Sequence, residues 1–159
     1  MTGFPKPSRT ARKMSERTTR LERQAYERAE KANVRRRDRV CRFPLCGCRA
    51  LKLPVEVAHC LHHKGMGGNP TGTRSTRAGM ILLCRHRHRD GAVSWHHGTL
   101  RAQPLTDAGT NGPVAWEVEG RAAGLNPYGG WRCIAVERAG GVLASCDADT
   151  LARLAQMVL

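Results

Sequence analysis

The order of apolar and polar positions predicts one amphipathic helix near the start of the chain, over residues 19–34. Thr19 and Glu22 have the spacing of a capping box, which marks a helix start. The apolar face of this helix is formed by Leu21, Ala25, Ala29 and Ala32. Because this face is mostly alanine, we expect the helix to pack loosely or to become firm only against a partner.

Basic residues surround this helix. Pro5 and Pro7 oppose helix formation, so residues 1–13 are expected to form a disordered basic arm. After the helix, the run RRRDR at 35–39 supplies a cluster of guanidinium groups. Three of these residues are candidates for binding nucleic acid: Arg35, Arg36 and Arg37. Residues 1–40 are therefore interpreted as one unit, a basic arm with a helix.

Patterns in the middle of the chain predict short strands. PVEVAH at 54–59 alternates in the manner of a strand, with its two valines on one face. MILLC at 80–84 is either a short buried strand or a lead into a helix. A long polar, glycine-rich loop at 64–79 separates the two. The segment 91–105 is interpreted as an irregular strand pair.

The last third of the chain predicts more strands and a final helix. PVAWEVEG at 113–120 alternates cleanly, and the apolar runs at 131–137 and 141–146 flank RAGG, which is typical of a hairpin. A leucine-rich stripe after Asp147 predicts a helix that ends the chain. Together these elements predict an α+β fold in which residues 111–159 form the C-terminal β-hairpin plus helix.

Charge narrows the function classes. The chain has 159 residues and a formal net charge of +14. Lys and Arg outnumber Asp and Glu by 13 to 5 in residues 1–40 and by 9 to 2 in residues 41–100, but not in residues 101–159, where the counts are 5 and 6. Such a positive field attracts polyanions, of which nucleic acid is the commonest. No apolar run reaches the ~18 residues of a membrane span, so we expect a cytoplasmic protein without a membrane partner.

Cysteine spacing predicts a structural zinc site. Cys41 and Cys46 lie in a proline-containing turn, and Cys84 ends an apolar run, so each segment suits one knuckle of a tetrahedral site. Three residues are candidates for the fourth ligand: Cys48, His86 and His88. With 4% aromatic residues the core is thin, and a bound metal is one way to stabilise it. The remaining cysteines have the character of ordinary thiols: Cys60, Cys133 and Cys146.

The order of these motifs resembles the HNH endonuclease family. The likeness covers about residues 41–107 and consists of the cysteine knuckle, EVAH, KGMGG, MILLC and then His88. The stretch SWHHGTLRAQPLTDAGTNGP also resembles the tail of HNH proteins encoded by actinobacterial phages. The resemblance implies a ββα-metal core, a β-hairpin and helix that hold one catalytic metal ion, and it places this core at residues 41–110.

The resemblance also implies roles for individual histidines. His59, at the end of the alternating strand, matches the general base that activates water. His88 matches the helix histidine that ligates a catalytic divalent metal (Mg²⁺, Mn²⁺, Ni²⁺ or Zn²⁺), and His96 is a candidate second ligand. In an alternative register, His62 would hold the metal and His63 would be the base. Lys64, which follows them, is a further candidate for binding nucleic acid.

Three positions depart from the family pattern. Ala58 stands where an acidic or histidine metal ligand often precedes the base, and Glu56 and His63 are the candidates to replace it. Gly79 stands at a position that is often Asn, and Arg87 at a knuckle position that is usually Cys or His.

Two functions therefore compete, beside a third possibility in which the chain is a structural phage component and residues 111–159 dock another protein. The first is a metal-dependent DNA endonuclease in the host cytoplasm, with phage packaging or replication proteins as further partners. The second is a zinc-stapled nucleic-acid-binding protein whose nuclease site is degenerate.

Overall fold

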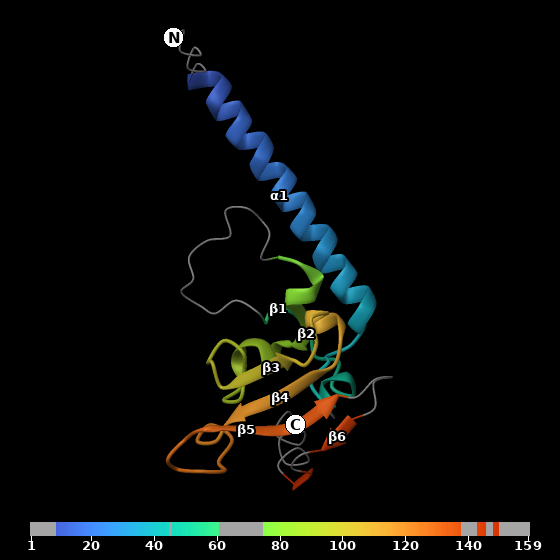
Figure 1. Cartoon of the computed structure of the whole chain (residues 1–159), viewed down its shortest axis with the longest axis vertical. Helices are drawn as coiled ribbons and strands as arrows, with labels where there is room; N and C mark the ends of the chain where they lie inside the picture. Colours follow the sequence, from blue (N-terminus) through green and yellow to red (C-terminus); the bar gives the residue numbers. More distant parts are fainter. Residues whose placement is uncertain (1–8, 45, 61–74, 138–142, 146–147, 150–159) are drawn as a thin grey trace.

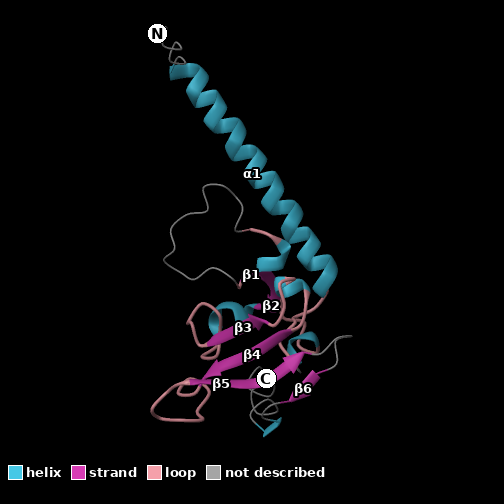
Figure 2. Cartoon of the chain, viewed as in Figure 1, coloured by secondary structure: helices cyan, strands magenta, loops and turns pink. Residues whose placement is uncertain are grey.

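In its described residues, the protein combines one long helix with two small antiparallel sheets (Figures 1 and 2). The computed structural model describes residues 9–44, 46–60, 75–137, 143–145 and 148–149. The first sheet consists of β1 (Val55–His59) and β2 (Met80–Cys84). The second has the order β3 (Leu100–Pro104), β4 (Val114–Glu119), β5 (Trp131–Glu137) and β6 (Leu143–Ser145). The α+β class expected from the sequence is confirmed.

The helix α1 (Arg9–Asp38) begins ten residues before the expected start. Residues 9–13 are helical, so the expectation of a disordered arm is wrong for them, and residues 1–8 lie outside the described part. The physical reason is that both prolines precede Arg9, and the residues after it include many good helix formers and no proline or glycine. Arg39, at φ +58°, leaves the helical conformation. None of the described helices is both long and apolar enough to cross a membrane.

Only the last turns of α1 pack against the body of the protein, and the rest projects away from it (Figure 1). Val34 is fully buried against Met80 and Leu82 of β2. Nearby, the Asp38 carboxylate accepts a hydrogen bond from the Leu82 backbone N–H at 2.9 Å. Toward the N-terminus of the helix, Leu21 remains half-exposed, which agrees with the weak apolar face predicted from the sequence.

The β1–β2 hairpin separates two small cores. Partner residues in the register point to the same face, and His59 pairs with Met80 while Glu56 pairs with Leu83. Met80 belongs to the cluster beneath α1, whereas Leu83 belongs to the main core. His59 therefore lies on the α1 face of the hairpin, and Glu56 lies on the opposite face.

Three short helices complete the connections: η1 (Gly47–Arg49), η2 (Arg77–Gly79) and η4 (Gly109–Asn111). A fourth, the π-helix η3 (His86–Asp90), directly follows β2. The expected strand pair at 91–105 is one strand, β3, preceded by turns, and β3 pairs with β4 across the expected domain boundary at residues 110 and 111. The β5–β6 hairpin is confirmed. Of the expected C-terminal helix, only residues 148–149 are described, and they are helical.

Trp116 of β4 joins the second sheet to residues 41–48, the cysteine segment, which contains Cys41, Cys46 and Cys48. The indole is fully buried, and its ring meets the Phe43 ring edge-on with centroids 5.5 Å apart. Its Nε1–H donates to the Glu137 carboxylate at 3.2 Å. The aromatic pair thus bridges segments that are far apart in the chain.

We expect Trp116→Ala to lower the free energy of unfolding by about 3–5 kcal/mol, because it opens a cavity and leaves the Phe43 ring without its partner. Chemical denaturation followed by circular dichroism measures this loss. Trp131→Ala is the matched control, since Trp131 is 37% exposed. Equal losses in the two variants would contradict this role for Trp116.

Candidate metal centre and histidine cluster

Four cysteines come together where the segment after α1 meets the end of β2. The backbone N–H of Arg42 donates to the Leu82 carbonyl at 2.8 Å, which aligns this segment beside β2. The η1 turn then reverses the chain. Cys84, the last residue of β2, completes a group with the three cysteines of the segment: Cys41, Cys46 and Cys48.

The geometry of this four-cysteine cluster fits zinc. All four sulfur atoms lie within 4.8 Å of one another, and Cys46 Sγ is 3.7 Å from Cys84 Sγ. A tetrahedral ion with Zn–S distances of about 2.3 Å places its sulfur ligands roughly 3.8 Å apart. The cluster is the only group of this kind in the described part of the chain. Of the three candidates for the fourth ligand, Cys48 is the one that lies in the cluster, and His86 and His88 lie outside it.

The thiols of the cluster affect one another's pKa. Hydrogen bonds from Cys41 and Cys84 lower the pKa of Cys46 to about 2, whereas burial is the main cause that raises the pKa of Cys48 to about 12. The thiolate form is therefore favoured most at Cys46. A bound cation would draw out the remaining protons, because zinc binds the thiolate form.

His88 forms a separate polar group on the core side of the hairpin. It lies on η3, and its Nδ1 donates to the Glu56 carboxylate at 2.6 Å. Arg89 Nε reaches the same Glu56 oxygen at 2.8 Å. The hydrogen bond with His88 is the largest cause that lowers the pKa of Glu56. Glu56 thus fixes the imidazole with Nε2 as the remaining ring nitrogen.

His96 stands beside this pair. Its backbone N–H donates to the His88 carbonyl at 2.9 Å, which folds the turns after η3 back onto the helix. The two imidazole rings are perpendicular, with centroids 4.9 Å apart. The structure therefore brings together His88 and His96, the two histidines expected to hold a catalytic metal.

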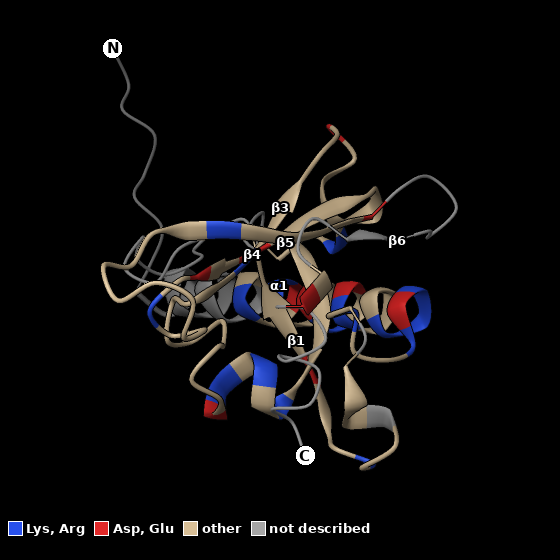
Figure 3. Cartoon of the chain, turned by 90° about the horizontal axis from the view of Figure 1, so that it is seen from below, with Lys and Arg blue, Asp and Glu red and all other residues tan. Residues whose placement is uncertain are grey.

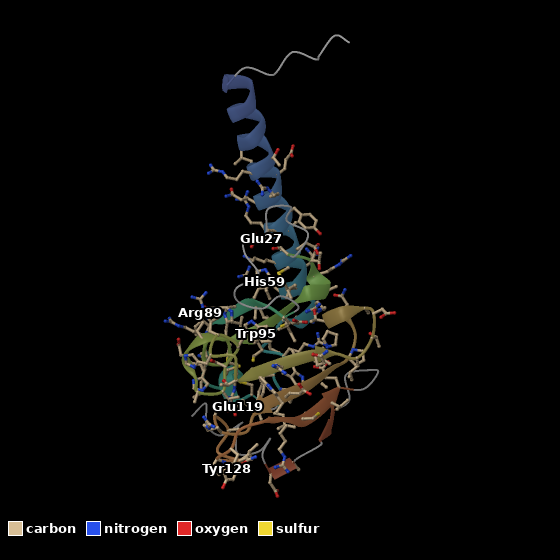
Figure 4. The ribbon with its side chains drawn as sticks, turned by 60° about the vertical axis from the view of Figure 1, so that its left-hand side comes forward. Glu27, His59, Arg89, Trp95, Glu119 and Tyr128 are labelled. Carbon is tan, nitrogen blue, oxygen red and sulfur yellow. The ribbon has the colours of Figure 1, made fainter. Side chains whose placement is uncertain are left out.

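His59 lies apart from this group. Its Nε2 is 3.5 Å from Ser75 Oγ, and it faces α1 near Glu27 (Figure 4). The pKa of Glu27 is lowered mainly by its hydrogen bond with Lys31 and to a lesser degree by His59. Since Glu56 and His88 are on the other face of the hairpin, the structure does not bring the expected base and metal ligand together.

The other residues expected near the base divide into two groups. Ala58 is fully buried in the main core, so no ligand at this position would face solvent. The residues of the alternative register and the adjacent lysine lie outside the described part: His62, His63 and Lys64.

The arginines after the helix also have different environments. Arg35 and Arg36 are exposed. Arg37 instead donates to the Met80 carbonyl and to Asn111 Oδ1, each at 2.8 Å. Figure 3 shows basic positions interleaved with acidic ones along α1, and the helix carries 11 Lys and Arg against 5 Asp and Glu.

Sequence reasoning missed two partners in these groups. Arg89 shares the Glu56 carboxylate, and Ser75 approaches His59. Neither residue belongs to a motif, so no signal in the sequence identifies them before the register of the hairpin is known. A comparison of the chain with protein-family models, curated proteins and solved structures gives no match.

We expect Cys48→Ser to lose most of the bound zinc and to unfold at a lower temperature, because the variant removes one of the four sulfur ligands. Elemental analysis and thermal denaturation measure both effects. Cys133→Ser and His86→Ala are the controls, since neither residue belongs to the cluster. Zinc loss in His86→Ala but not in Cys48→Ser would contradict the assignment.

Proposed function

We propose that the protein is a metal-dependent DNA endonuclease of the HNH type, in which the β1–β2 hairpin and η3 act as the ββα-metal unit. The observation that carries this proposal is the Glu56–His88 pair. Histidines that ligate metals usually donate their second ring nitrogen to a carboxylate, which sets the tautomer and strengthens the ligand. Here Nδ1 is the donor, so Nε2 is the nitrogen that would take the metal.

Four residues of this chain would have separate roles in phosphodiester hydrolysis. Glu56 orients His88, and His96 supplies a second imidazole beside it. A divalent ion held there would stabilise negative charge on the leaving oxygen of the scissile phosphate. His59 is proposed as the general base that takes the proton from the attacking water.

A second function is favoured by the separation of His59 from His88. A base and a metal ligand that lie on opposite faces of one hairpin can reach the same phosphate only if the phosphate binds at the edge of the hairpin. Ala58 is also buried where a ligand would be expected. A zinc-stapled nucleic-acid-binding protein with an inactive nuclease site needs neither a base close to His88 nor a metal ligand at position 58.

A plasmid-nicking assay with Mg²⁺, Mn²⁺, Ni²⁺ or Zn²⁺ separates the two functions. We expect the wild type to nick DNA, and His88→Ala to lose the activity while DNA binding and tightly bound zinc remain. Glu56→Gln should lower the rate less than His88→Ala, because the amide still hydrogen-bonds the imidazole. His97→Ala is the matched control, since His97 lies in the same turns and its ring Nδ1 is 3.0 Å from the Gly91 carbonyl oxygen.

The same assay assigns the base. His59→Ala should cost ~10²–10⁴-fold in rate, as expected for a general base. If His63→Ala abolishes nicking and His59→Ala does not, the alternative register holds. If the wild type nicks DNA with none of the four metals, the binding function replaces the endonuclease.

Salt dependence tests the contact with DNA. We expect the double variant Arg35→Gln/Arg36→Gln to reduce the magnitude of the slope of log affinity against log salt by up to about 1.8. The reason is that binding releases about 0.9 fewer counterions for each phosphate contact that is lost. Arg121→Gln is the control, since Arg121 is exposed at the turn after β4. The slope is measured by fluorescence anisotropy on a labelled duplex. An unchanged slope in the double variant would remove these arginines from the DNA contact.

A further inference from the structure

Arg87 is a fully buried arginine beside the four-cysteine cluster. It lies on η3, with none of its surface exposed. Its guanidinium stacks on the Phe43 ring, 4.6 Å from the centroid, and Nη1 donates to the Val93 carbonyl at 3.4 Å. Neither neighbour carries a formal negative charge. Burying a cation in such a place is costly unless charge nearby compensates it.

The four-cysteine cluster is the group that can supply this charge. Arg87 follows Cys84 by three residues, and the Phe43 ring on which it stacks lies between Cys41 and Cys46 in the chain. Burial lowers the pKa of Arg87, and the groups that act most strongly in the other direction are Cys46, Cys84 and Cys41. Cys46 also forms a hydrogen bond with the Arg87 side chain. The main favourable electrostatic interactions of the Arg87 guanidinium are therefore with the cysteine cluster.

Metal loading changes this charge balance. Without metal, the four sulfurs do not all carry negative charge, because ordinary cysteine thiols are mostly protonated at neutral pH. With zinc, all four sulfurs are thiolates, and the complex carries two negative charges in excess. The attraction between Arg87 and the cluster thus increases on loading.

We propose that Arg87 is the interior counter-charge of a tetrathiolate zinc centre and that it favours the metal-loaded protein over the metal-free one. This inference depends on the zinc centre and is independent of the proposed nuclease activity. It also gives a role to the residue that departs from the knuckle pattern: Cys48 supplies the fourth sulfur, and Arg87 balances the charge that the sulfur adds.

The test uses opposite effects of one variant on two measurements. In the full-length protein, Arg87→Met should weaken zinc binding by roughly 10- to 100-fold, the range for losing a hydrogen bond to a charged group. The same variant should leave the metal-free protein as stable as wild type or more stable, because an apolar side chain replaces a buried cation. Competition with a chromophoric chelator gives the affinity, and thermal denaturation after chelation gives the stability.

Two further variants complete the design. Arg87→Lys keeps the charge and should lose less affinity than Arg87→Met. Arg85→Met is the matched control, because the Arg85 side chain is 59% exposed and pairs with Asp90 at 3.0 Å. It should change zinc affinity less than about fivefold, as surface ion pairs are weak.

Each outcome decides the inference. If Arg87→Met lowers metal-free stability and zinc affinity together, Arg87 only fills space and the inference is wrong. It is also wrong if zinc affinity is unchanged, or if the wild type binds no zinc, in which case the zinc centre fails with it. Should Arg87→Met not fold, Arg87→Gln replaces it, and a Gln variant that binds zinc as tightly as the Lys variant overturns the inference. Loss of nicking with normal zinc affinity concerns the nuclease proposal alone.

Discussion

The structure depends on β2, a strand that is buried on both faces and whose backbone forms hydrogen bonds with several other segments. Its Leu82 N–H donates to Asp38 at the end of α1, and the Leu82 carbonyl accepts from the cysteine segment. β1 pairs along its other edge. Because a buried backbone needs all its hydrogen bonds, these segments are held in one arrangement. The strand ends at Cys84, so this arrangement also positions the cysteine cluster.

The cluster in turn positions the candidate catalytic group. η3 follows Cys84 directly and carries His88, so a metal bound by the four sulfurs would fix the start of the helix that holds this histidine. A thin core makes this coupling important. Structural zinc contributes ~10–16 kcal/mol of apparent binding energy in small zinc-binding units, which is comparable to the whole stability of an ordinary domain. Stability and the geometry of His88 are therefore expected to change together when zinc is removed.

Local patterns predicted the strands but not the contacts between them. Alternation located β1 and β4, and the RAGG signal located the β5–β6 hairpin, because these depend on neighbouring residues alone. The capping-box spacing of Thr19 and Glu22 predicts a start of α1 ten residues too late, because the residues from Arg9 onward contain no proline or glycine and continue the helix. Cys48 was one of three candidates for the fourth ligand, and only the path of the chain through η1 selects it.

The position of His59 shows a different limit. The alternation in VEVAH already places His59 with Val57 and opposite Glu56. It does not place His88, which lies on η3 after the next strand, so the resemblance to a motif alone put both histidines in one site. The Glu56–His88 contact could not be predicted in the same way, since it requires the register of β1 against β2 and the tight turn of η3.

The arginine run at 35–37 shows why a basic patch cannot be interpreted as one unit. Successive residues on a helix point about 100° apart, so three adjacent arginines cannot share a face. Arg37 points at the body, where it donates to carbonyl and side-chain oxygens of other segments. Arg35 and Arg36 remain exposed and add to the positive field of α1. The exposed positive charge is therefore smaller than the sequence count, and Arg37 instead links the end of α1 to β2 and η4.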